Sequence, residues 1–351
     1  MMTAAASPKA RAPHIRRATF VLIPFLVLAS ESAHAEGPMS YLRTYGPAGY
    51  PVTALGWGLG IISVIVIVII GILLLGGIFR PRRGMSHAPE ALAVNRDAGG
   101  MSWIYIGVGI SSAVLLGCIV WTLVTISAIA SPAGTSALTI HVIAHQWWWE
   151  VHYITPNGPS FTTANEIHIM VGQPVRIELT SDDVIHSFWV PQIAGKMDVI
   201  PGQTNITWLQ ADKPGTYRGQ CAVFCGAQHA HMALLVIVDK PKQFQAWWNG
   251  QAKPAPMPVS ADARHGQQVF GARCAACHTV SGTNAGGIVG PDLTHLMSRH
   301  TLAAGMLPNN RGNLAAWISD PQGIKYGSRM PNLMLAPSDL SAVVAYLDTL
   351  K

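Results

Sequence analysis

The sequence has 351 residues, of which 50% are hydrophobic and only 11% are charged. This length exceeds that of a typical single domain, and the composition indicates several modules, some of them inserted in a membrane. The formal net charge of +6 could suit a nucleic acid. However, the basic residues are scattered or flank apolar segments and form no patch interleaved with aromatic residues, so no nucleic-acid partner is expected.

The first 35 residues predict a secretory signal peptide. Arg16 and Arg17 precede a short apolar run at 20–28, and the small residues Ala33 and Ala35 follow it. This order is typical of a signal peptide that is cleaved, here after Ala35. A first membrane anchor is the alternative, but the apolar run is short for one.

Two longer apolar runs, 53–79 and 102–130, predict a transmembrane hairpin. Each exceeds the roughly 20 residues that cross a hydrocarbon core, and neither contains an acidic or basic residue. Arginines concentrate in the loop between them, 80–101, which the positive-inside rule therefore places in the cytoplasm. The segment 36–52 and everything after residue 130 should then lie on the exported side, with membrane lipid around the helices.

The rest of the chain divides into a β-rich part and a helical part. Residues 131–239 contain short β-rich runs separated by turn residues, which predict an antiparallel sandwich or barrel. In residues 240–261, Pro254, Pro256 and Pro258 alternate with other residues, so a stiff, extended linker is expected. From 262 to 351 the pattern of apolar residues is helical.

The loop from Cys221 to Met232 carries the side chains that copper selects. Its two thiols, at 221 and Cys225, accompany His229 and the thioether of Met232, and soft copper prefers thiolate and thioether ligands. His186 follows a predicted strand and could reach the loop. Zinc would leave the methionine unused, and a mononuclear blue copper needs one cysteine. Two cysteines, two histidines and a methionine are more ligands than one copper ion takes, so they predict a dinuclear copper centre with bridging thiolates. A disulfide between the two cysteines is the alternative in the protein without metal.

The pentapeptide Cys274-Ala275-Ala276-Cys277-His278 has the form that attaches a c-type haem. Both cysteines would form thioethers with the porphyrin, and His278 would bind the iron. A redox dithiol is the alternative, which the adjacent histidine disfavours. The sixth ligand is expected to be methionine. Four methionines compete: Met297, Met306, Met330 and Met334. Met330 is preferred, because it ends a Gly-containing loop before the last helix, and Met334 comes second.

Taken together, these residues resemble cytochrome c oxidase subunit II in the bacterial form that carries a fused C-terminal cytochrome c domain. The segments that carry the resemblance are 145–150, 184–191, 195–198 with 200–202, 221–232 and 274–278. The resemblance implies a multidomain membrane protein with three parts. These are a two-helix transmembrane hairpin (53–79 and 102–130), an all-β cupredoxin-like Greek-key domain (131–239) and an all-α class I cytochrome c domain (262–351).

The family also implies roles for individual residues. Cys221 and Cys225 would bridge the two coppers of a CuA centre, with His186, Met232, His229 and the backbone carbonyl of Val223 as terminal ligands. Trp147 matches the aromatic residue through which electrons enter from a docked cytochrome. Asp198 falls in the segment that faces subunit I of the oxidase. Because the β-rich part is not conspicuously acidic, the fused haem domain is expected to make a largely apolar contact around Trp147.

Two positions depart from the family pattern. Val223 replaces a glutamate whose side chain helps to bind magnesium at the interface with subunit I, and Gln203 replaces a commonly basic residue. Copper ligation survives at Val223, because any residue offers a carbonyl. The magnesium site and the kind of catalytic partner are left open.

The resemblance implies the electron-accepting subunit of a proton-translocating cytochrome c oxidase in the bacterial inner membrane, with both soluble domains in the periplasm. Cytochrome c or another periplasmic donor would reduce the fused haem, which reduces CuA, which reduces the haem-copper centre of subunit I. A CuA subunit of a haem-copper nitric oxide reductase is the alternative that Val223 leaves open. A copper-binding or redox-sensing membrane protein without a catalytic partner is less favoured, because storage needs no haem.

Overall fold

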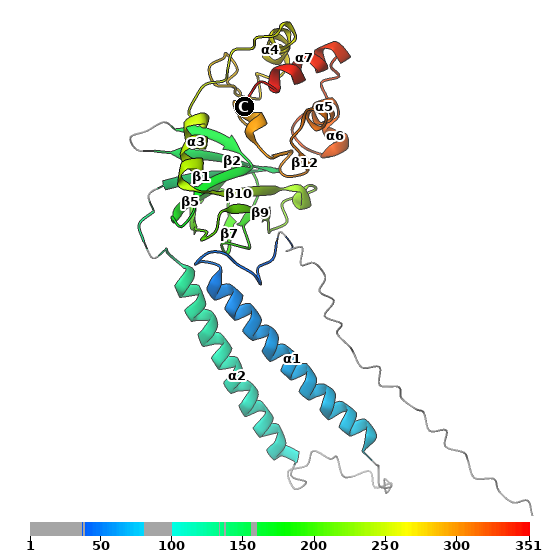
Figure 1. The fold of residues 1–351 in the computed structure, drawn as a ribbon. Helices are drawn as coiled ribbons and strands as arrows, with labels where there is room; N and C mark the ends of the chain where they lie inside the picture. Colours follow the sequence, from blue (N-terminus) through cyan, green and yellow to red (C-terminus); the bar gives the residue numbers. More distant parts are fainter. Residues whose placement is uncertain (1–36, 38, 81–99, 133, 137, 156–159) are drawn as a thin grey trace, which may run out of the picture. The chain divides into compact units, whose positions relative to one another are not determined.

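The computed structural model divides into two units, residues 1–37 and 38–351, and all the elements below belong to the second (Figure 1). It describes residues 37, 39–80, 100–132, 134–136, 138–155 and 160–351. The predicted signal peptide and most of the predicted cytoplasmic loop, 81–99, lie outside the described residues.

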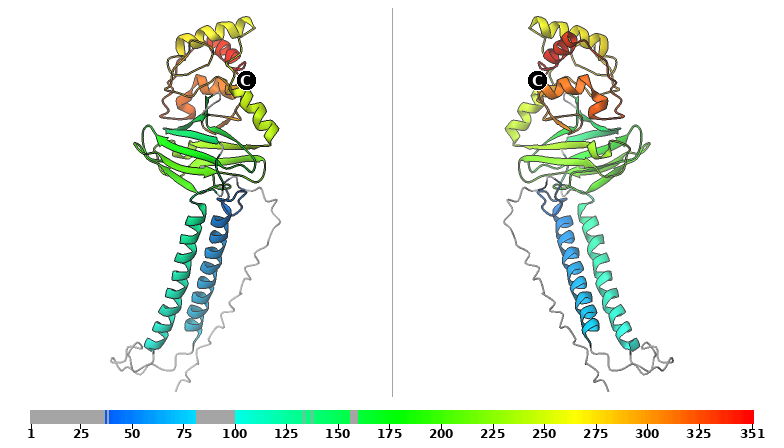
Figure 2. Two further views of the ribbon diagram at one scale, coloured as in Figure 1. Left: turned by 90° about the vertical axis from the view of Figure 1, so that its left-hand side faces the viewer. Right: turned by 90° about the vertical axis from the view of Figure 1, so that its right-hand side faces the viewer.

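The β domain consists of two five-stranded sheets, with strand orders β3-β2-β1-β5-β8 and β4-β10-β9-β6-β7 (Figure 2). The strands are β1 (Leu138–His145), β2 (Trp148–Ile154), β3 (Phe161–Ala164), β4 (Glu166–Met170), β5 (Val175–Ser181), β6 (His186–Trp189), β7 (Lys196–Val199), β8 (Asn205–Leu209), β9 (Gly215–Cys221) and β10 (Ala233–Asp239). Pairing is antiparallel except between β1 and β5 and between β4 and β10. The predicted sandwich is confirmed.

Alternating apolar residues explain why these strands form and where the core lies. In β5, Val175, Ile177 and Leu179 are buried while the residues between them are partly exposed. This period of two directs one face of the sheet inward. Trp149 and Phe188 meet edge to face inside the sandwich, with ring centroids 5.6 Å apart.

Residues 241–251 form a helix, so the prediction of an extended linker is wrong for this stretch. Helix α3 (Pro241–Gln251) begins with a proline in its first turn and a capping box between Lys240 and Gln243. Trp247 stacks on His168 of β4 with ring centroids 4.0 Å apart. This stacking contact anchors α3 on the β domain. The alternating prolines come only after the helix ends.

The C-terminal part is helical, as predicted. Its elements are α4 (Ala261–Arg273), η3 (Leu296–Ser298), β11 (Thr301–Leu302), β12 (Leu307–Pro308), α5 (Arg311–Ser319), α6 (Pro321–Ile324) and α7 (Pro337–Leu347). Helices α4 and α7 lie side by side (Figure 2). Gly266 permits their close approach, because a Cβ there would lie 1.9 Å from the carbonyl oxygen of Ala342.

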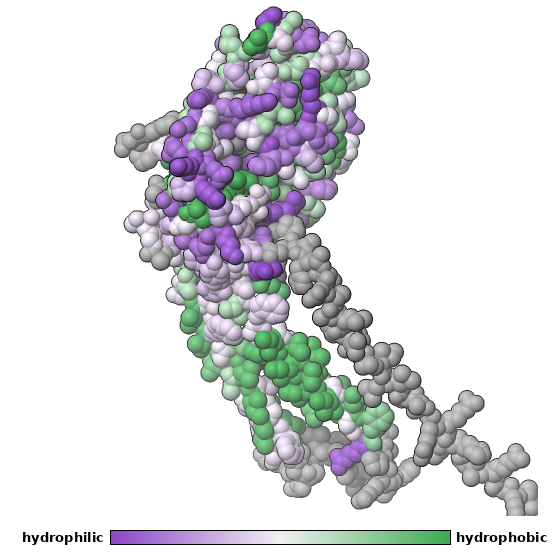
Figure 3. All heavy atoms as spheres, viewed as in Figure 1, coloured by the Kyte–Doolittle hydropathy of each residue, from purple (hydrophilic) through white to green (hydrophobic). Residues whose placement is uncertain are grey.

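Two further helices, α1 (Tyr50–Phe79) and α2 (Gly100–Ile129), are long and apolar enough to cross a membrane. Hydrophobic side chains gather along much of both helices (Figure 3). Gly58 of α1 packs against Trp121 of α2, since a Cβ there would lie 2.1 Å from the indole. The hydroxyl of Thr122 donates to the carbonyl of Cys118 within α2, as a polar group in an apolar helix requires.

We expect Gly266→Ala to destabilise the haem domain by about 1–3 kcal/mol or more, because its methyl group must displace the α7 backbone. Gly271→Ala in the same helix is the matched control, since no atom lies within 4 Å of its Cβ. The control should be unchanged or more stable by up to about 1 kcal/mol. Thermal unfolding of the two variants measures the difference, and equal midpoints would contradict the packing described.

Candidate metal centre and haem pocket

Strand pairing brings His186 to the cysteine loop. His186 begins β6, Cys221 ends β9, and the two strands are neighbours with Phe188 opposite Cys221. The Cys221 sulfur lies 3.9 Å from Nδ1 of His186 and 3.7 Å from the Cys225 sulfur. The ligand atoms of His186, Cys221 and Cys225 all lie within 4.8 Å of one another.

The remaining predicted ligands converge on the same point. The Cys225 sulfur lies 3.6 Å from Nδ1 of His229 and 3.9 Å from the Met232 sulfur. The carbonyl oxygen of Val223 lies 3.2 Å from the Cys221 sulfur. His229 begins a 3₁₀ turn, η2 (His229–His231), and Met232 directly follows it. All six predicted positions therefore come together.

Asp183 holds the His186 ring, a role that the sequence did not reveal. Its Oδ1 atom lies 2.9 Å from Nε2 of His186, which leaves Nδ1 directed at the Cys221 sulfur. Burial alone would lower the pKa of His186, but hydrogen bonds to Asp183 and Cys221 outweigh it and raise that pKa. Such an outer carboxylate fixes the tautomer and orientation of a metal-binding imidazole.

The two thiols form a coupled pair. The hydrogen bond with Cys225 lowers the pKa of Cys221 to about 3. The same contact and burial raise the pKa of Cys225, because a second thiolate beside the first is disfavoured. Both cysteines are free, and their 3.7 Å separation is well beyond the roughly 2.05 Å of a disulfide. A buried set of thiol, imidazole and thioether donors fits soft copper.

Trp147 packs directly on this loop. Its indole N–H donates to the carbonyl of Cys225 over 3.1 Å, and the Gln146 side chain donates to the same oxygen over 2.7 Å. A Cβ at Gly226 would lie 3.0 Å from the Trp147 ring. Only 8% of Trp147 is exposed. The predicted electron-transfer residue is thus in contact with the metal loop rather than open to solvent.

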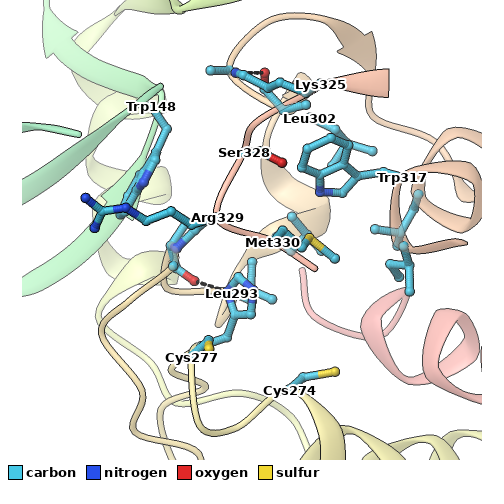
Figure 4. Close-up of a pocket in the computed structure, with 18 of the residues that line it drawn as sticks. Trp148, Cys274, Cys277, Leu293, Leu302, Trp317, Lys325, Ser328, Arg329 and Met330 are labelled. Carbon is cyan, nitrogen blue, oxygen red and sulfur yellow. Dashed lines mark hydrogen bonds between the residues drawn. The ribbon is translucent and has the colours of Figure 1, made fainter. Parts of the chain in front are cut away.

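The C-terminal domain contains a cavity that is lined by Cys274, Cys277 and His278 of the haem-attachment pentapeptide (Figure 4). Nδ1 of His278 lies 2.8 Å from the carbonyl oxygen of Pro291. This bond leaves Nε2 as the nitrogen available to iron. Burial lowers the pKa of His278, which favours the neutral, ligating form. The largely apolar lining and the two thiols fit a covalently attached haem.

Met330 lines the cavity and Met334 does not. Figure 4 shows the Met330 side chain within the cavity, across from the two cysteines. The Gln322 amide donates to the Met330 carbonyl over 2.7 Å and fixes the loop that carries it. Met334 is 88% exposed. The geometry favours the first of the two predicted methionines.

Arg299 is a buried cation in the cavity wall that the sequence did not identify. It donates to the carbonyl of Asp292, while its Nε has no hydrogen-bond partner among the described residues. Burial lowers its pKa. A buried guanidinium with a free donor suits a carboxylate, and a haem carries carboxylates. The cavity therefore fits the group that the pentapeptide predicts.

Fold and sites together define a class of protein in which a cupredoxin-like β domain with a candidate metal site is joined to a helical domain with a cavity that fits a haem. Residues 159–239 match the family described as Cytochrome C oxidase subunit II, periplasmic domain, and residues 263–351 match the family Cytochrome c. The predicted resemblance and fold class are confirmed.

Named relatives agree with this assignment. The chain is 41% identical over 220 residues to cytochrome c oxidase subunit 2 of Alkalihalophilus pseudofirmus. It is 32% identical over 231 residues to cytochrome c oxidase subunit 2 of Bacillus sp. strain PS3. Each alignment covers 62% of this chain and 63% of the relative, so the chain spans less than two thirds of their length.

Among solved structures, the periplasmic domain of subunit II of cytochrome oxidase from Bradyrhizobium japonicum is similar at 32% sequence identity. The match covers 34% of this chain and 96% of that one, with a TM-score of 0.32.

We expect Met330→Leu to abolish methionine ligation and to lower the reduction potential of the haem by on the order of 100 mV. Met334→Leu makes the same chemical change at an exposed position and should leave the potential unchanged. Redox titration of the haem absorbance compares them. A shift in the Met334 variant alone would contradict the assignment.

Proposed function

We propose that this chain is the electron-accepting subunit of a membrane-bound haem-copper oxidase. One observation carries the proposal. Trp147 donates to the carbonyl of Cys225 in the metal loop, and the same tryptophan lines the haem cavity. One side chain thus contacts both candidate redox sites, which suits a protein that moves electrons between them.

Copper would be held by the cysteine loop and His186, and haem by the pentapeptide and Met330. The copper ligands would be Cys221, Cys225, His186, His229, Met232 and the Val223 carbonyl. Cys274 and Cys277 would hold the haem covalently, with His278 and Met330 on its iron. When bound, the haem and a two-copper CuA centre supply carriers that each take up and release one electron. The surplus of ligands is what supports two coppers rather than one.

Burial and an outer carboxylate hold the ligands of the metal site in place. Cys221 is 2% exposed, and His186 and Met232 are 0% exposed, so these three donors are shielded from water. Asp183 fixes the His186 ring from outside. Attachment of the haem domain to the same chain makes the meeting of the two sites intramolecular, which raises their effective concentration.

The two apolar helices support placement in the bacterial inner membrane, with residues 131–239 and 262–351 on the periplasmic side. The Trp208 indole N–H donates to the Ile129 carbonyl over 2.9 Å, and the Tyr50 hydroxyl donates to Asp212 over 2.7 Å. These bonds tie the β domain to the ends of α2 and α1. A partner subunit I would complete the oxidase, couple oxygen reduction to proton translocation and lie near the exposed Asp198. Cytochrome c or another periplasmic protein would be the donor.

Val223 keeps a second candidate function open, a CuA subunit of a haem-copper nitric oxide reductase. Its apolar side chain cannot bind the magnesium ion that the family's glutamate helps to hold. A copper-storage or redox-sensing role has less support, because the cavity beside Trp147 is built for a haem.

The purified complex tests the proposal through His186→Ala. We expect its copper affinity to fall by more than the roughly 10–100-fold that loss of an outer-shell partner causes. Oxygen consumption should fall with it while the haem stays reducible by the donor. His265→Ala, an exposed imidazole of helix α4 outside the metal loop, is the control and should keep both. Full oxygen turnover by His186→Ala would contradict the proposal, and wild-type turnover of nitric oxide but not oxygen would select the second candidate.

A further inference from the structure

Lys325 of the haem domain is buried against the metal loop. Only 3% of it is exposed. Its Nζ donates three hydrogen bonds of 2.8 Å, to the carbonyls of Ala303, Trp147 and His231. Ala303 belongs to the haem domain, whereas Trp147 and His231 belong to the β domain, and His231 lies within the metal loop itself.

This arrangement uses the full donor capacity of the ammonium group. An ammonium has three N–H donors and accepts no hydrogen bond, and a buried cation is tolerated only where those donors are paired. Two of the three acceptors come from the other domain. The three hydrogen bonds of Lys325 can therefore all form only when the haem domain is docked on the β domain, and we call this arrangement the seated position.

The residues after Lys325 extend the same contact. We call residues 325–330 the seating loop. The Gln228 amide donates to the Tyr326 carbonyl over 2.9 Å. Gly327, at φ +81°, lies against the Trp147 ring, and this left-handed backbone favours glycine. Met330 then enters the haem cavity, so one short loop joins both sites.

Arg329 of the seating loop reaches the outer shell of the metal site. Its Nη2 lies 3.5 Å from Oδ2 of Asp183, whose other oxygen binds His186. The guanidinium is 55% exposed, so this pair contributes less than the buried lysine. The domain contact predicted to be largely apolar thus has a polar, charged centre, and that prediction is wrong.

We propose that Lys325 is a positioning residue that seats the haem cavity on Trp147 and so sets the rate of internal electron transfer. The inference rests on the proposed function. While the domain is seated, Trp147 is covered, so an outside donor reaches this ring only through the haem domain.

Lys325→Met tests the proposal in the intact, metal-loaded protein. Lys253→Met removes the same charge from an exposed site and is the matched control. Measurements at about pH 6 keep Lys325 charged, because burial lowers its pKa to about 7. After photoreduction of the haem, we expect transfer of one electron to the oxidised copper to slow by about tenfold or more in Lys325→Met. The rate should also become dependent on solvent viscosity, because the domain must find its seat.

A second measurement does not depend on electron transfer. Oxidation of Trp147 by N-bromosuccinimide, followed by mass spectrometry, should rise severalfold in Lys325→Met but not in Lys253→Met. Unchanged haem and copper spectra establish that both domains remain folded; if they do not, Lys325→Gln takes the place of the methionine variant. Unchanged Trp147 oxidation together with an unchanged transfer rate would overturn the proposal. Absence of transfer in the wild type would instead overturn the proposed function, while Trp147 oxidation still decides the role of Lys325.

Discussion

The hydrogen bond from the Trp147 indole to the Cys225 carbonyl is the contact on which the arrangement of the two sites depends. It fixes the ring against the metal loop from within the β domain. The backbone carbonyl of the same residue accepts from Lys325 of the haem domain. A single residue is thereby held by both domains, which gives the haem cavity and the cysteine loop a shared wall.

The β domain supplies the rigidity that this contact requires. The ends of β6 and β9 carry His186 and Cys221, so pairing of the two strands sets the spacing of an imidazole and a thiol that are distant in sequence. Buried aromatic rings pack beneath them, including Trp149, which lies edge-on to His186. A ligand set built on strands holds its geometry better than one that lies only on loops.

The candidate metal and haem ligands could be proposed from the sequence because their chemistry is local. Thiols, imidazoles and a thioether within one loop restrict the metal, and the pentapeptide restricts the haem. The sequence could rank Met330 above Met334 as the candidate iron ligand but could not exclude Met334, because only the fold shows which of the two side chains lies in the cavity. The prediction of an extended linker failed at 241–251, because a capping box and aromatic packing stabilise a helix there, and the prolines come only after it.

Asp183, Arg299 and Lys325 could not be found from sequence because their roles come from tertiary contacts. Each is an ordinary charged residue until folding removes it from water and gives it a defined partner. Asp183 becomes the support of His186, Arg299 a donor in the haem cavity, and Lys325 a bond between domains. All three are distinguished from the other charged residues by burial of their charged groups.

Flash photoreduction of the haem in the wild-type, copper-loaded protein tests the central claim most directly. Two sites that share Trp147 within one chain should exchange an electron in a first-order step. We predict that copper is reduced at a rate independent of protein concentration and of added donor. A haem that stays reduced until an outside donor reduces the copper, or a rate that rises with protein concentration, would contradict the account.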